Sequence, residues 1–381
     1  MNIRNYRGKW IWLLPLVVLS NCKTPYDPQI KTSKDHYLVV EGFINPDGVT
    51  NIKLSRTRNI TWGDTAAYIN EANAKVIIED DRNSVYSLFD MGGGNYSGNY
   101  YLDANAKYRL HIFTDDNREY LSDFVPCKIS PPIQQVGWKF NNNGDVQIFV
   151  NTEDPTNNTR FYRWDYTETW EFHSEYISGF IYDPVTNKVL PRTVPVFICY
   201  RTRNASNVIL GSSLKLKDDV IHEAPVTLIP NHDKRISVLY STIVTQYALD
   251  SAGYNYWNAL KGNTENVGSI FDPQPNQTKG NLHCITDTTE KVIGYIGAGT
   301  TDHQRIFISN SSMPDDWNLV PNCTEYDVPV DSLKFYFGQG MYIPYKADPD
   351  GDPFPKAYFS ASASCVDCTL SGSPVKPTFW P

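Results

Sequence analysis

The chain has 381 residues, 20% of them charged and 13% aromatic, and a formal net charge of −8. An acidic chain is a poor candidate for binding nucleic acid or an anionic membrane surface, because like charges repel. The length allows two or three domains. Its 25 Tyr and 4 Met, with scattered Pro and Gly, favour a β-rich protein and exclude a disordered composition.

The first residues have the layout of an export signal. A basic stretch within residues 1–9 precedes an apolar run at 10–19 that is too short to span a bilayer. The run ends in VLSNC, which resembles a bacterial lipobox whose cysteine, Cys22, is acylated and becomes the mature N-terminus. An ordinary cleaved signal or a short anchor helix, with Cys22 incidental, is the alternative. We predict a signal peptide at 1–21 and a polar tether at 22–36 that carries lipid on Cys22.

Residues 37–130 are predicted to form a first β-sandwich. An Asn-Pro-Asp-Gly turn at 45–48 separates two strand-like runs. Tyr108, Leu110 and Ile112 alternate with polar residues, which is typical of a half-buried strand. The three glycines at 92–94 are followed by strand rather than helix, so they predict a hairpin turn and not a phosphate-binding loop.

Residues 131–268 are predicted to form a second sandwich, after a proline-containing boundary at 129–133. A change of period predicts one amphipathic helix near 250–262, beginning at Asp250. Several aromatic residues in this block could form a sugar-stacking platform, but their alternation favours packing in the core. These residues are Trp138, Trp164, Tyr166 and Trp170.

Residues 269–381 are predicted to be an irregular, Cys-rich extension packed on the second domain. Apart from Cys22 there are six cysteines, an even number that favours disulfides in an exported chain. They are Cys127, Cys199, Cys284, Cys323, Cys365 and Cys368. Their distribution suggests one bridge from Cys127 to Cys199 and two among the last four. A zinc site using Cys284, Cys323, His283 or His303 with the C-terminal pair, and a redox role for that pair, are alternatives.

Catalytic and metal motifs are sparse. The histidines lack metal-type pairing, and Ser212 and Ser213 lack the spacing of a nucleophile elbow. The acids at 348, 350 and 352 depart from the calcium-loop pattern and favour a solvated turn. Three further acids, Glu168, Glu171 and Glu175, lie in a strand-like aromatic stretch, where we expect solvent-facing side chains rather than an acid/base pair. We predict no catalytic residues, no metal and no cofactor.

Several stretches resemble a known family. They include YLVVEGFI, YRLHIFTDDNREYLSD, YRWDYTETWEF, the long run from Tyr240 to Leu282, and the closing CVDCTLSGSPVKPTFW. The family is that of Bacteroidota lipoproteins catalogued as domain of unknown function 4249. The first block is also similar to transthyretin- or carboxypeptidase-regulatory-type sandwiches. The second is similar to fibronectin type III or immunoglobulin-like sandwiches.

The resemblance implies an outer-membrane lipoprotein that is encoded beside SusC-like TonB-dependent receptors. We expect it to face the cell exterior, with the periplasmic face as the alternative. It implies no catalytic residues. We therefore expect a non-enzymatic accessory of such a receptor in nutrient uptake, which captures a glycan or peptide ligand or acts as a structural partner. The alternatives are a free-standing adhesion or glycan-binding lipoprotein and, third, a surface hydrolase.

Overall fold

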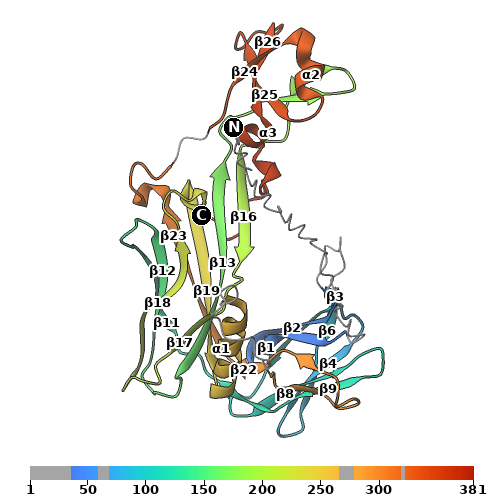
Figure 1. Cartoon of the computed structure of the whole chain (residues 1–381), viewed down its shortest axis with the longest axis vertical. Coiled ribbons are helices and arrows are strands. Elements are labelled where there is room, and N and C mark those ends of the chain that lie inside the picture. The colour runs from blue at the N-terminus through green and yellow to red at the C-terminus, as the bar shows by residue number, and fades with distance from the viewer. Residues whose placement is uncertain (1–35, 59–67, 266–278, 319–321) are drawn as a thin grey trace, which may run out of the picture. The chain divides into compact units, whose positions relative to one another are not determined.

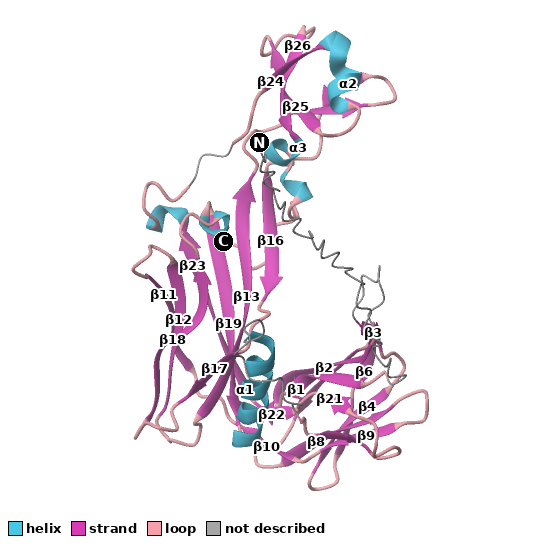
Figure 2. Cartoon of the chain, viewed as in Figure 1, coloured by secondary structure: helices cyan, strands magenta, loops and turns pink. Residues whose placement is uncertain are grey.

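The computed structural model describes residues 36–58, 68–265, 279–318 and 322–381. The predicted signal peptide, Cys22 and nearly all of the predicted tether lie outside these residues. The described chain is built mostly from strands, as predicted (Figures 1 and 2). None of its helices is long and apolar enough to cross a membrane.

The first sandwich is a 13-stranded sheet that encloses one apolar core. Ten of its strands come from the first block: β1 (Leu38–Ile44), β2 (Asp47–Thr57), β3 (Tyr68–Asn70), β4 (Lys75–Asp80), β5 (Val85–Ser87), β6 (Phe89–Gly92), β7 (Asn95–Tyr101), β8 (Lys107–Phe113), β9 (Glu119–Ser122) and β10 (Val125–Lys128). The predicted turn joins β1 to β2, and the glycines join β6 to β7. Tyr108, Leu110 and Ile112 are fully buried, as their alternation predicts.

Three short strands from much later in the chain complete this sheet: β20 (Leu282–Cys284), β21 (Val292–Ile293) and β22 (Gly297–Gly299). β21 and β22 pair in parallel with β1, and β22 also pairs in parallel with β10. Gly294 permits this close approach, because a Cβ on it would lie 2.2 Å from the Val40 carbonyl oxygen. The prediction that 269–381 packs on the second domain is therefore wrong for 282–299.

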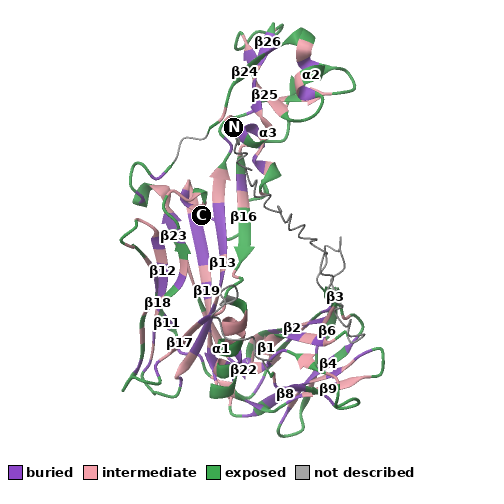
Figure 3. Ribbon diagram, in the orientation of Figure 1, coloured by how far each residue is buried: buried purple, intermediate pink, exposed green. Residues whose placement is uncertain are grey.

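The second sandwich has two antiparallel sheets. One contains β11 (Ile133–Phe140), β12 (Val146–Asp154) and β18 (Asp219–Ile229). The other has the order β16 (Ile198–Asn204), β13 (Phe161–His173), β19 (Leu239–Leu249) and β23 (Thr301–Ser309), with β17 (Ile209–Ser212) also paired to β13. Residues of both sheets share one core. Figure 3 shows β13 and β19 largely buried and the outer strand β16 largely exposed.

The helix α1 (Ser251–Glu265) follows β19, close to its predicted bounds. Short 3₁₀ helices lie at η1 (Lys234–Ile236) and η2 (Asn310–Ser312).

The C-terminal part contains a small three-stranded sheet of β24 (Tyr326–Pro329), β26 (Ala357–Ser362) and β25 (Tyr342–Asp348). It carries the short helices α2 (Leu333–Phe337) and α3 (Ala363–Val366) and the 3₁₀ helices η3 (Val330–Ser332) and η4 (Cys368–Leu370). The small sheet and α2 share an apolar cluster. A hairpin inserted in the second block, β14 (Phe180–Asp183) and β15 (Lys188–Pro191), packs against this cluster. Trp380, in the tail, is buried and donates its ring N–H to Glu171, so it anchors the tail on the second sandwich.

Two disulfides join the C-terminal part to itself and to β16: Cys323–Cys365 and Cys199–Cys368. The predicted Cys127–Cys199 bridge is wrong. Of the two bridges predicted among the last four cysteines only Cys323–Cys365 is present, and both Cys127 and Cys284 are free thiols. Cys127 on β10 and Cys284 on β20 are three strands apart in the sheet. Strand spacing places them roughly 14 Å from each other, beyond the reach of a disulfide. Cys365 and Cys368 are each bonded to a distant cysteine, so this structure offers the C-terminal pair neither as zinc ligands nor as a CxxC disulfide.

Candidate functional site

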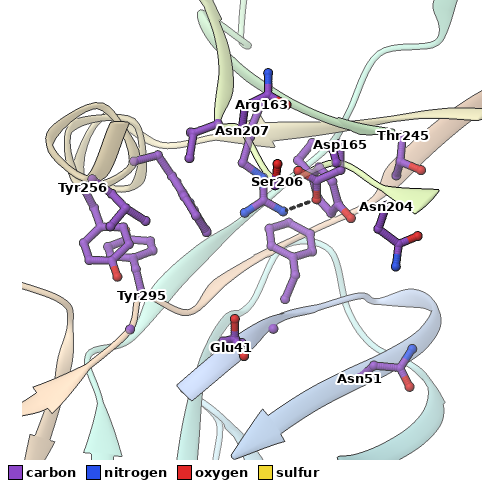
Figure 4. A pocket seen from close by; sticks show the side chains of 18 of the residues that line it. Glu41, Asn51, Arg163, Asp165, Asn204, Ser206, Asn207, Thr245, Tyr256 and Tyr295 are labelled. Atoms are coloured by element: carbon purple, nitrogen blue, oxygen red, sulfur yellow. Dashed lines mark hydrogen bonds and ion pairs between the residues drawn. The ribbon is translucent and has the colours of Figure 1, made fainter. Parts of the chain in front are cut away.

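A pocket of about 850 Å³ lies where the first sandwich meets the second (Figure 4). β1 and β2 form one side of it, together with the segment at 293–295. The opposite side consists of the outward face of β13 and β19, the helix α1 and the loop at 204–208 that follows β16. The volume falls within the roughly 300–1,000 Å³ of small-molecule sites, which often lie between domains.

Asp250 fixes the helix that closes one end of the pocket. Its carboxylate accepts the backbone N–H of Gly253 at 2.7 Å, which caps the first turn of α1. The same oxygen accepts the Tyr295 hydroxyl at 3.0 Å, from the segment that returns to the first sandwich. Tyr295 stacks on Tyr256 of the helix, with ring centroids 5.3 Å apart. The helix is therefore tied to both sandwiches.

A second aromatic contact crosses the junction. Phe43 of β1 packs edge-on against Tyr247 of β19, with ring centroids 5.1 Å apart. Both side chains are only partly buried and line the pocket. Burial and the Asp165 carboxylate raise the pKa of Tyr247 by more than the Arg163 guanidinium lowers it, so the tyrosine hydroxyl stays neutral at physiological pH.

Arg163 is a buried polar residue in the wall of the pocket. Its guanidinium lies 4.2 Å from the ring centre of Tyr247 and 4.3 Å from that of Trp257, and it donates to Asp165 at 2.9 Å. The residue is 9% exposed, and its Nε has no hydrogen-bond partner in the described part of the chain. An unpaired buried donor destabilises a fold by about 1–3 kcal/mol. A site that keeps one is a good candidate for function.

The rest of the lining combines apolar side chains, such as Val49, Leu260 and Ile293, with polar ones, and it carries little charge. Asn51, Asn204, Ser206 and Asn207 are exposed around the pocket. The carbonyl oxygens of Asn51 and Asn204 accept the hydroxyls of Ser97 and Thr167 respectively. Within the described residues, no further bond engages their NH₂ groups. The charged groups are Glu41, Asp165 and Arg163, which sum to −1.

The aromatic residues that suggested a platform are in the core, as predicted. Trp164 is fully buried, and Tyr166 and Trp170 are 8% and 9% exposed. Trp138 packs against the same cluster. Only Tyr166 also reaches the pocket.

The prediction of solvent-facing acids is wrong for Glu168. This residue is fully buried and accepts hydrogen bonds from Arg203, Arg235 and Tyr240. It follows the alternation of Trp164 and Tyr166, so it faces the core and its charge is neutralised there. Glu175 is exposed, as predicted, whereas Glu171 is largely buried under Trp380, so the prediction is wrong for Glu171 as well.

The other sequence candidates are not brought together. Ser213 is buried and donates to Asp219. His283 is exposed beside Asp123, and Lys346 pairs with Asp350. No group of three potential metal ligands is present in the ranges that the structure describes.

Sequence reasoning missed the pocket residues Arg163, Asp165 and Trp257. The alternation that buries Trp164 necessarily turns Arg163 and Asp165 to the opposite face, so this signal was available. Trp257 could be assigned to a helix but not to a pocket, because its neighbours come from β13 and β19.

Solved structures similar to this chain include β-sandwich proteins. A two-domain fibronectin type III segment of chicken tenascin is 9% identical, with 55% of this chain and 90% of that chain covered and a TM-score of 0.17. The FN1–FN3 domains of chicken CNTN1 are 10% identical, with 56% and 62% covered and a TM-score of 0.19. These scores are too low to support an argument about fold, which rests on the strand order above.

A comparison with curated proteins gave no match. The model of one family, described as "Domain of unknown function (DUF4249)", matches residues 23–305. This range holds both sandwiches except the end of β23, and it includes every residue of the pocket. The chain therefore belongs to the DUF4249 family.

Proposed function

We propose that this protein is an exported, lipid-anchored binding protein that captures a ligand in the pocket between its two sandwiches. The observation that carries the proposal is the pocket itself, with Arg163 held buried between two aromatic rings at its wall. A purely structural protein would gain nothing from a buried arginine with an unpaired Nε–H donor at this junction.

The proposal includes binding without catalysis. The described lining offers two carboxylates, Glu41 and Asp165, and the second is ion-paired with Arg163. Neither Cys, His nor Lys contributes to this lining. The arrangement supports recognition of a ligand better than nucleophilic or acid/base chemistry.

Anchoring is proposed through acylation of Cys22 and insertion of its acyl chains into the outer membrane, with the pocket facing the cell exterior. Metabolic labelling with a tagged fatty acid tests this step. We expect label on the wild type and none on Cys22→Ala, and the mature chain should begin at residue 22. An unlabelled wild-type chain would contradict the anchor.

Partnership with a SusC-like TonB-dependent receptor completes the proposal and rests on the family resemblance. Affinity purification of the full-length protein from detergent-extracted outer membranes should recover a β-barrel receptor repeatedly. Repeated recovery of the intact lipoprotein without any barrel protein would contradict the partnership and favour a free-standing adhesion or glycan-binding lipoprotein.

A further inference from the structure

We infer that the pocket takes a neutral saccharide of a few rings. This inference rests on the proposed capture function and names its ligand class. Three properties of the pocket wall support it: partly exposed aromatic rings, both donors and acceptors of hydrogen bonds, and a slight negative charge.

The aromatic rings supply apolar surface of the right kind. Phe43, Tyr247 and Trp257 line the pocket and are each partly exposed. Trp257 is held in place by Arg163 and by an edge-on contact with Tyr256 at 5.5 Å. The C–H faces of a pyranose ring are flat and apolar, so they gain by covering such rings. Rings that are already fixed lose little conformational entropy when a ligand binds.

Polar groups around these rings complement hydroxyls. The NH₂ groups of Asn51 and Asn204 are available as donors, and the carboxylates of Glu41 and Asp165 are acceptors. A sugar hydroxyl donates one hydrogen bond and accepts others, so each can use both kinds of group. A purely apolar ligand would leave these groups without partners, which opposes its binding.

Charge argues against acidic ligands. Arg163 already donates to Asp165, so the one cation among the described lining residues is neutralised and Glu41 remains in excess. The whole chain is also acidic, with a net charge of −8. A sialylated or sulfated glycan or a phosphate would be repelled, whereas a neutral saccharide would not.

A binding assay on an array of neutral, sialylated and sulfated glycans tests the inference with the full-length protein. We expect neutral glycans to bind in preference to acidic ones of the same backbone. Trp257→Ala should weaken the affinity for the best neutral glycan roughly tenfold, and Trp257→Phe should restore part of it. Phe335→Ala serves as control, because Phe335 is 81% exposed and lies outside the pocket, and it should bind normally.

A second variant guards against misfolding of the first. Asn207 is exposed in the loop at the pocket, so Asn207→Ala should preserve the fold and still weaken neutral-glycan binding. Binding of acidic glycans in place of neutral glycans would overturn the inference. So would neutral binding that neither variant affects, or no glycan binding at all. If no glycan binds but the affinity purification recovers a receptor, the saccharide inference fails and the proposed function stands. If no glycan binds and no receptor is recovered, both the inference and the proposed function fail.

Discussion

Replacing the buried carboxylate of Glu168 should destabilise the second sandwich strongly. Glu168 is fully buried in β13 and accepts Arg203 at 2.6 Å, Arg235 at 2.9 Å and Tyr240 at 2.9 Å. Burial raises the pKa of Tyr240, and the charge of Glu168 raises it further, so the tyrosine acts as a neutral donor. Glu168→Gln keeps the shape of the side chain but removes the charge that these donors surround.

The magnitude follows from what the substitution leaves behind. The Arg235 side chain is 11% exposed and would lose its ion pair with residue 168, while its ion pair with Asp233 at 2.9 Å remains. Breaking a buried ion pair from one side costs about 3–5 kcal/mol. Because Arg235 keeps one carboxylate and Arg203 is 56% exposed, we expect a loss of about 3 kcal/mol in the free energy of unfolding.

Hydrogen exchange in increasing urea, read by mass spectrometry, measures this change domain by domain. Peptides from β13 and β19 should open more readily in Glu168→Gln, while peptides from β8 in the first sandwich serve as an internal control. Glu175→Gln, at an exposed position two residues beyond β13, should change the free energy by less than about 0.5 kcal/mol. A loss below about 1 kcal/mol for Glu168→Gln would refute the reasoning.

Three further predictions concern stability. Replacing Cys323 and Cys365 by Ser opens a loop with a sequence separation of 42, so the C-terminal part should lose about 4 kcal/mol of stability in a urea titration. Burial raises the pKa of Glu79, but hydrogen bonds from His111 and Arg109 outweigh it and lower the pKa below 4.5. The unfolded chain therefore binds more protons than the folded one in acid, so the free energy of unfolding should fall below about pH 4.5. Glu79→Gln should flatten that pH dependence. Gln246→Leu removes a buried side chain that accepts the Trp164 ring N–H and donates to the Pro131 carbonyl, and should lower the melting temperature more than Gln134→Leu, at an exposed site.

Local sequence patterns predicted the strands and the helix α1 well, because these elements depend on residues that are close together in the sequence. Alternation identified β8 and the buried face of β13, turn residues identified two hairpins, and Asp250 marked the start of α1. Each of these signals arises within a few residues of the element that it specifies.

The connections between elements could not be predicted, because they depend on contacts between distant residues. β21 and β22 have two and three residues, too few to carry a periodic pattern, and their partner β1 is about 250 positions earlier in the chain. The disulfide from Cys199 to Cys368 spans 169 positions for the same reason. Glu168 was misassigned because its partners Arg203 and Arg235 are brought to it only by the fold.

The candidate site, like these connections, depends on contacts between distant residues. Its residues come from β1, β2, β13, β19 and α1, the loop at 204–208 and the segment at 293–295, and no single stretch of the chain contains more than a few of them. Only the alternation of apolar and polar residues along β13 indicated that Arg163 and Asp165 point away from the core.

The most direct test of ligand capture in the pocket is hydrogen exchange with and without the neutral glycan that binds most strongly on the array. We predict protection in three regions that line the pocket, at 39–51, 163–167 and 256–264. Peptides from the small C-terminal sheet, 326–362, should be unchanged. Protection confined to the C-terminal sheet or to the outer face of the first sandwich, with the pocket regions unaffected, would contradict the account.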